Sequence, residues 1–351
     1  MRRQGGRKAH REIRRLPARR DLRCRWDTLR PVARRELRTL DAHVAGQTVR
    51  LVAGGISAPR GTTMQTRLDD ARERLDDARL AVTCEPRGHA DLVGALLAEA
   101  TEPTAHAGLL SFDVADWRSP STVVQMAALR LAVDGGLITM GDPGATLIVE
   151  TPAGVRQLRL GPGGRITALG INAQIVGGSC AITVGQRTAG ADVVVCAGGL
   201  RAIVDAESVG LSLVTLERRR LGELRAAVAR SLVQAGYSAP LDELLVTGPA
   251  HGQADVHVVA VGESGRIDRS PTGEGAAAVA TVLDAIGLVE GDRIVKIEGP
   301  SGGILEARLV SRHERDGTPA VDVEVGGTAW LIGEHTWYWD DDDPLGAGFV
   351  M

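Results

Sequence analysis

Two hydroxyl residues occupy matching places in two stretches of the chain that read almost alike. Ser121 follows Arg118-Ser119-Pro120, and Thr272 follows Arg269-Ser270-Pro271. Each precedes an apolar, alanine-rich stretch of helical character. Farther on, residues 149–154 resemble residues 297–302, so the chain carries a duplicated domain rather than a short solenoid repeat. If the two copies face each other, the hydroxyls flank one cleft from opposite sides, as a reaction on both faces of a carbon would require.

The start of a helix is a suitable place for such chemistry. Its unpaired N–H groups and roughly half a positive charge attract a carboxylate, and they stabilise the negative charge that forms when a Cα proton leaves. The amides of Thr122, Gly273 and Glu274 are therefore candidate parts of the site, and Asp268 is a candidate partner for a substrate ammonium. Serine and threonine are also the commonest N-caps, so a capping role for both hydroxyls is compatible with a site role.

The elements around these residues predict an α/β (α+β) protein. Each half reads as a strand, the hydroxyl, a buried helix and then a β-meander, which predicts two similar lobes, each a central helix enclosed by mostly antiparallel strands. We expect a basic disordered extension over 1–38, a first lobe over 39–200 to which part of the chain's end may be added, and a second lobe over 201–351. The expected helices are 64–80, 91–97, 122–133, 214–235 and 276–286, and the expected strands include 40–53, 108–114, 256–261, 321–325 and 329–332.

Composition narrows the class of protein. In 351 residues, 44% hydrophobic and 24% charged residues are ordinary for a globular protein. No apolar run approaches the ~20 residues of a membrane span. Aromatic residues make up 3%, which argues against a surface that stacks nucleic-acid bases.

Cysteine and histidine spacing gives no sign of a metal or another cofactor. Cys24, Cys84, Cys180 and Cys196 form neither a ligand motif nor a disulfide framework, which fits a reducing cytoplasm. His251, His257, His313 and His335 also lack ligand spacing, and we expect surface or satisfied interior positions for them.

Charge is distributed unevenly. Residues 1–38 contain 15 Arg and Lys against 4 Asp and Glu, whereas the remainder has 26 against 40. This head is either a nucleic-acid-binding arm or an appendage without consequence. The second interpretation is favoured, because aromatic residues do not interleave with the arginines and the body is acidic.

Five motifs in the same order resemble those of the proline racemase family. The segment Asp268–Gly275 resembles the signature D-R-S-P-C/T-G-x-G. The other four resemble D-x-H-x-x-G, E-P-R-G-H, A-I-V-D-A and D-P-L-x-x-G-F, at residues 41–46, 85–89, 202–206 and 343–349. The resemblance spans residues 40–351.

The resemblance implies a cofactor-independent enzyme with two lobes, like diaminopimelate epimerase, that acts at Cα of proline or hydroxyproline. Racemases and epimerases of the family have a cysteine at both helix starts, whereas trans-3-hydroxy-L-proline dehydratases have threonine at the second. Thr272 therefore implies the dehydratase branch and a small-molecule imino-acid substrate. A homodimer is left open.

Departures from the family pattern cluster in the site. Ser121 stands where the family has cysteine, Val123 where it has histidine, and Glu274 where it has Thr or Ser. A serine hydroxyl is a poorer base than a thiol, and an ionised Glu274 would repel a bound carboxylate. His89 is a candidate substrate contact, although a structural tie is favoured. The hypotheses are a dehydratase-like enzyme with Ser121 as base and Thr272 opposite, a catalytically impaired binding protein, or a racemase- or epimerase-like isomerase.

Overall fold

The computed structural model describes residues 34–140, 144–263, 265–315, 317–340 and 342–350. Most of the expected basic extension, with Cys24, lies outside these residues. The first strand begins at Arg34, so the folded part starts earlier than the expected boundary after residue 38.

The strands of the described residues form one large sheet that is mostly antiparallel. One part contains β1 (Arg34–Val44), β2 (Gln47–Gly54), β3 (Val93–Ala98), β4 (Ala107–Phe112), β5 (Trp117–Arg118), β6 (Thr146–Thr151), β7 (Gly154–Leu160) and β8 (Arg165–Ile175). The other contains β9 (Cys180–Val184), β10 (Arg187–Cys196), β11 (Gly199–Asp205), β12 (Leu241–Gly248), β13 (Val256–Val261), β14 (Val295–Glu298) and β15 (Ile304–Arg315).

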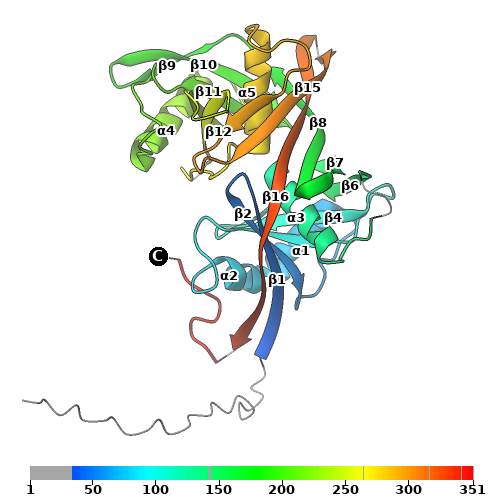
Figure 1. Ribbon diagram of the computed structural model, residues 1–351. Helices are drawn as coiled ribbons and strands as arrows, with labels where there is room; N and C mark the ends of the chain where they lie inside the picture. Colours follow the sequence, from blue (N-terminus) through cyan, green and yellow to red (C-terminus); the bar gives the residue numbers. More distant parts are fainter. Residues whose placement is uncertain (1–33, 141–143, 264, 316, 341, 351) are drawn as a thin grey trace, which may run out of the picture.

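The last strand, β16 (Thr318–Asp340), runs the length of the molecule (Figure 1). Its first half pairs with β15 and β8, and its second half pairs with β1, from Val44 opposite Ala329 to Arg34 opposite Asp340. The C-terminal part of the chain therefore completes the lobe in which the described residues begin.

Two helices of equal length lie at the centre. α3 (Thr122–Asp134) and α5 (Gly273–Ala285) each have 13 residues, and most of their side chains are buried. Helices that are apolar on nearly every side belong in a core, and both contribute to a single apolar cluster with strands of the two lobes. The predicted α/β class, with a helix enclosed by strands in each of two lobes, is confirmed.

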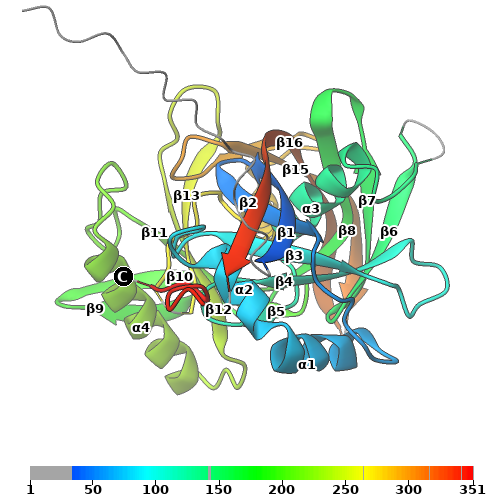
Figure 2. The same ribbon diagram turned by 90° about the horizontal axis from the view of Figure 1, so that it is seen from below.

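The remaining helices cover the outside. α1 (Met64–Arg74) and α2 (Asp76–Thr83) pack on the first lobe, and α4 (Arg218–Gln234) packs on the second (Figure 2). A short 3₁₀ turn spans Pro162–Gly164. Among the helices of the described residues, none combines the length and apolar character that crossing a bilayer requires.

Several sequence predictions of local structure were wrong. The helix expected at 91–97 is strand β3, because a short apolar run fits a fully buried strand as well as a helix. The single strand expected at 40–53 is a hairpin, turned at Ala45 and Gly46, whose φ angles of 47° and 86° suit a tight primed turn. The helix expected at 64–80 is divided at Leu75, and the strands expected at 321–325 and 329–332 are one strand, β16.

Candidate functional site at the facing helix N-termini

Ser121 and Thr272 each stand immediately before a buried helix. Ser121 precedes α3 with extended backbone, is exposed, and makes no capping hydrogen bond with its side chain. Thr272 precedes α5 and is 5% exposed, and its Oγ1 accepts a hydrogen bond of 3.0 Å from the amide of Gly275. The two hydroxyls therefore have matching positions and different surroundings, and only Thr272 caps its helix.

The backbone of Thr272 is strained. Its φ of 56° is rare for a β-branched residue, and such conformations cost on the order of 1–3 kcal/mol. The amide of Thr272 donates to Ser270 Oγ at 3.2 Å, and its Oγ1 donates to Glu243 Oε2 at 3.3 Å. Strain of this kind concentrates at functional sites, so the geometry supports Thr272 as a functional residue better than Ser121.

Glu274 joins the two helix N-termini. Its Oε1 accepts hydrogen bonds from the amide of Thr122 at 2.9 Å and from Thr122 Oγ1 at 2.8 Å. Both residues are buried. Because the first amides of a helix attract anions, the carboxylate from the first turn of α5 occupies the anion position at the start of α3.

The two helix starts also touch. A Cβ atom added to Gly273 would lie 2.5 Å from Thr122 Cβ, closer than two such atoms can approach. Val123, which stands where the family has histidine, is 2% exposed and belongs to the central apolar cluster. Three predicted site residues, Thr122, Gly273 and Glu274, are therefore brought together, and Val123 is directed into the core.

Asp268 lies beside a cation of the protein itself. Its Oδ1 is 3.5 Å from a guanidinium nitrogen of Arg266, whose other terminal nitrogen is 3.3 Å from Asp113 Oδ2. Burial raises the pKa of Asp268, against the influence of Arg266. A carboxyl that resists ionisation and already has a cationic neighbour is a weaker partner for a substrate ammonium than the sequence suggested.

Sequence reasoning missed two functional candidates, Glu243 on β12 and Arg201 on β11. They stand opposite each other in the parallel pair and form an ion pair of 2.9 Å. Burial raises the pKa of Glu243 to about 7. The charge of Arg201 lowers this pKa, and the nearby carboxyls of Asp268 and Glu274 raise it. Charged residues within otherwise apolar strand segments were the signal that could have identified them.

The buried thiol of Cys196 cannot replace the missing cysteines. Cys196 is fully buried, and its carbonyl oxygen accepts a hydrogen bond of 2.6 Å from Arg201. Burial raises the pKa of the Cys196 thiol to about 12. The reactive thiolate is therefore disfavoured at neutral pH.

His89 lies next to Asp91, which forms ion pairs between the two lobes. Its Nδ1 accepts a hydrogen bond of 3.3 Å from the amide of Asp91, whose carboxylate pairs with Arg269 at 3.1 Å and with Arg218 at 3.7 Å. Burial, followed by the nearby charge of Arg269, lowers the pKa of His89. No hydrogen bond links His89 to either helix start among the described residues, and its role as a substrate contact stays a prediction.

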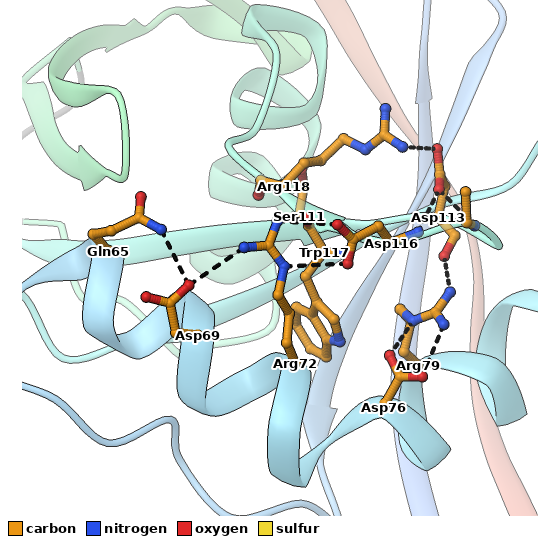
Figure 3. Close-up of polar contacts among 11 residues, drawn as sticks. Gln65, Asp69, Arg72, Asp76, Arg79, Ser111, Asp113, Asp116, Trp117 and Arg118 are labelled. Carbon is orange, nitrogen blue, oxygen red and sulfur yellow. Dashed lines mark hydrogen bonds and ion pairs between the residues drawn. The ribbon is translucent and has the colours of Figure 1, made fainter. Parts of the chain in front are cut away.

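The loop that leads into Ser121 is anchored by the outer helices (Figure 3). Arg72 of α1 binds the Asp116 carboxylate at 3.0 Å and the carbonyl oxygen of Trp117 at 2.8 Å, and Arg79 of α2 binds the carbonyl oxygen of Asp113 at 2.7 Å. Arg118 extends to the Asp113 carboxylate at 2.8 Å. These contacts fix the entry to α3. Arg118 pairs with Asp113 and Arg269 pairs with Asp91, rather than with Glu274.

Comparison with known proteins gives a consistent result. Residues 39–350 match the family model described as proline racemase. The proline racemase of Clostridioides difficile is 26% identical over 333 residues, which cover 90% of this chain and 98% of that protein. The trans-L-3-hydroxyproline dehydratase of Xenopus tropicalis is 28% identical over 331 residues, covering 90% of this chain and 95% of that protein.

A solved structure shows the same fold. The hydroxyproline epimerase from Agrobacterium vitis, solved with bound trans-4-hydroxy-L-proline, superposes with a TM-score of 0.75 at 23% identity. The superposition covers 90% of this chain and 95% of that one.

Proposed function

We propose, for a chain that belongs to the proline racemase family, that it is a catalytically impaired member whose interlobe site is closed by its own Glu274. Family members include racemases, epimerases and dehydratases. In this chain the retained function would be binding, of a small carboxylate that displaces Glu274 or of a protein partner, rather than proton transfer at Cα.

The hydrogen bonds of Glu274 to Thr122 carry this proposal. A substrate carboxylate at the start of α3 needs the amide that Glu274 Oε1 now holds at 2.9 Å. If the ligand entered while Glu274 stayed, two like charges about 4 Å apart at an effective dielectric near 20 would cost on the order of 4 kcal/mol. That is about the whole binding free energy of a millimolar ligand.

The state of the two hydroxyls supports the same proposal. Within the described residues, Ser121 forms no hydrogen bond through its side chain, so no neighbouring base activates it as a proton acceptor. Thr272 Oγ1 is engaged with Gly275 and Glu243. An isomerase of the racemase or epimerase type, which needs a proton carrier on each face of Cα, is the least supported of the alternatives.

A trans-3-hydroxy-L-proline dehydratase-like activity is the second candidate, and the Thr272–Glu243 contact favours it. A carboxyl with a pKa of about 7 within 3.3 Å of Thr272 Oγ1 can exchange protons at neutral pH. In this case Glu274 would leave Thr122 when substrate binds, and water would be eliminated to give pyrroline-2-carboxylate. Thr272 and Glu243 would take the acid–base role that the sequence assigned to Ser121.

One set of incubations separates the candidates. Purified protein is incubated in D2O with trans-3-hydroxy-L-proline, trans-4-hydroxy-L-proline or L-proline, and Cα deuterium and pyrroline formation are followed by NMR. In parallel, calorimetry measures binding of pyrrole-2-carboxylate to wild type, to Glu274→Ser and to Glu290→Ser, a control that removes an exposed glutamate.

The impaired-member proposal expects no exchange with the wild type and tighter binding of pyrrole-2-carboxylate by Glu274→Ser alone. Pyrroline formed by the wild type would establish the dehydratase candidate instead. Cα exchange with inversion at Cα and without pyrroline would establish an isomerase. Tight binding of the mimic by the wild type would show that Glu274 does not block the site.

A further inference from the structure

His251, His257 and Glu298 converge in the second lobe, away from the facing helix starts. One ligand atom from each residue lies within 4.8 Å of the other two. The two imidazole rings meet edge to face, with centroids 5.5 Å apart. Sequence spacing gave no hint of this cluster, and the expectation that both histidines are surface or satisfied interior groups was wrong for His257.

Strand pairing explains how residues so far apart in sequence meet. β13 and β14 run parallel, with His257 directly opposite Glu298, so their side chains lie on the same face of the sheet. His251 lies in the loop between β12 and β13. Its amide donates to Glu298 Oε2 at 2.8 Å, and its Nδ1 lies 3.2 Å from the same oxygen.

The ring nitrogens of His257 have no hydrogen-bond partner among the described residues. The residue is 5% exposed. A neutral imidazole carries one donor and one acceptor, and leaving a buried polar group unsatisfied costs about 1–3 kcal/mol. A ligand at this point would satisfy a nitrogen that the protein leaves unpaired.

The first lobe contains the same arrangement without the histidines. β4 and β6 pair in parallel with Gly108 opposite Glu150, as His257 is opposite Glu298. Glu150 accepts hydrogen bonds from the amide and hydroxyl of Thr101, three residues beyond the end of β3, as His251 is three beyond the end of β12.

Comparison of the two lobes shows which contacts of Glu298 are needed to hold the loop and which are not. Each glutamate ties down the loop before the neighbouring strand, and Thr101 shows that this tie needs no imidazole. His257 takes the place of Gly108, which the tie also does not need. The second lobe therefore places two imidazoles around a carboxylate that the loop already requires.

We propose that His251, His257 and Glu298 bind a divalent transition-metal ion, with Zn²⁺ the best match, outside the interlobe site. Two imidazoles and one carboxylate are a common protein donor set for Zn²⁺, with water as the fourth ligand. With metal–ligand bonds of ~2.0–2.1 Å, tetrahedral ligands lie roughly 3.3 Å apart. His251 Nδ1 and Glu298 Oε2 already lie at 3.2 Å, and the ligand nitrogen of His257 lies within 4.8 Å of both. The His251 side chain is 61% exposed, so the ion can enter from solvent.

The site is mechanically connected to the start of α5. The residue after Glu298, Gly299, packs so closely on Ser270 and Pro271 that an added Cβ would lie 2.7 Å from their backbone atoms. The amide of Ser301 donates to the carbonyl oxygen of Arg269 at 3.2 Å. A metal ion on Glu298 would therefore brace the segment that leads into Thr272.

The test uses the full-length, tag-free protein stripped of metal with a chelator. Calorimetry with ZnSO4 is run on wild type, on His251→Thr, on His251→Thr/His257→Gly, which reproduces the first lobe, and on His313→Gln as an unrelated histidine control. Co²⁺ replaces Zn²⁺ in a second series, because its visible spectrum reports the ligand geometry. Circular dichroism confirms that each variant is folded.

Wild type and His313→Gln should bind one Zn²⁺ per chain with micromolar or better affinity, and Co²⁺ should give a four-coordinate spectrum. Loss of one ligand in His251→Thr should weaken binding about 100-fold or more, since second-shell changes alone cost ~10–100-fold. Absence of stoichiometric binding by the wild type overturns the proposal. So does equal affinity in wild type and a folded His251→Thr variant.

Discussion

At the scale of single residues, buried carboxyls determine what the interlobe site can accept. Glu274 holds Thr122, Asp268 lies beside Arg266, and Glu243 pairs with Arg201. The start of α3 can bind an anion through its free amides. In this chain the carboxylate of Glu274 already occupies that position. Substitutions among these carboxyls should therefore alter ligand binding and pH dependence more than changes at Ser121.

Glu243 should give the protein a measurable pH dependence of stability. Its pKa rises from 4.5 to about 7 on folding, so the folded state holds a proton that the unfolded chain releases. The free energy of unfolding should fall as pH rises from about 4.5 to 7, by on the order of 3 kcal/mol from this group. Glu243→Gln should flatten that fall, as measured by urea unfolding at pH 4.5, 5.5, 6.5 and 7.5.

The slope with pH is the informative quantity. Glutamine is uncharged at every pH, so its contact with Arg201 adds no slope, whereas titration of Glu243 in the wild type does. An unchanged slope in Glu243→Gln would show that this carboxyl is already ionised at low pH.

At the scale of elements, the duplication places two helices of equal length with their starts in contact. α3 and α5 have different N-caps, one exposed and one strained, and Gly273 allows the close approach. The same duplication leaves a threonine and a glycine in the first lobe where the second has His251 and His257. Matching elements thus support different chemistry according to a few side chains.

Gly273→Ala should destabilise the protein even though alanine is the better helix former. The added Cβ would lie 2.5 Å from Thr122 Cβ, so one helix start must move, at a cost of about 1–3 kcal/mol. Gly222→Ala in α4 is the matched control, because no atom lies within 4 Å of its added Cβ.

The control should gain ~0.5–1 kcal/mol from helix propensity, so chemical denaturation should move the two variants in opposite directions. Equal stability of both alanine variants would mean that the helix starts separate readily and that the contact at Thr122 is not maintained in solution.

At the scale of the whole molecule, β16 makes the two lobes dependent on each other. Its first half pairs with β15 and β8, and its second half pairs with β1 as an antiparallel neighbour (Figure 1). Near its end, Trp339 packs with Leu37 and Leu75 in the apolar cluster of the first lobe. The chain's last strand therefore stabilises the lobe in which the described residues begin.

Trp339→Ala should cost roughly 3–5 kcal/mol, because the indole is 8% exposed and its removal leaves a cavity between β1 and α2. Trp330→Ala, on the same strand, removes an indole that is 57% exposed and should change stability by less than about 0.5 kcal/mol. Thermal unfolding of both variants checks the difference, and similar losses would show that the end of β16 is not part of the first-lobe core.

The sequence by itself determined the duplication, the family resemblance, the two buried helices and the hydroxyl before each. These features follow from local patterns: apolar periodicity, glycine and proline punctuation, and motifs whose order is visible in one dimension. Local ambiguity caused the errors. The run Val93–Ala98 is apolar throughout and carries no period that distinguishes a strand from a helix.

Tertiary structure alone decided which side chains meet. Glu274 reaches Thr122 across 152 positions, Glu243 meets Thr272 across 29, and His257 lies opposite Glu298 through parallel pairing. Such contacts depend on how lobes and strands are placed relative to each other, and no spacing rule encodes that placement. The sequence therefore indicated where an anion could bind, and only the folded chain showed that the protein's own carboxylate binds there.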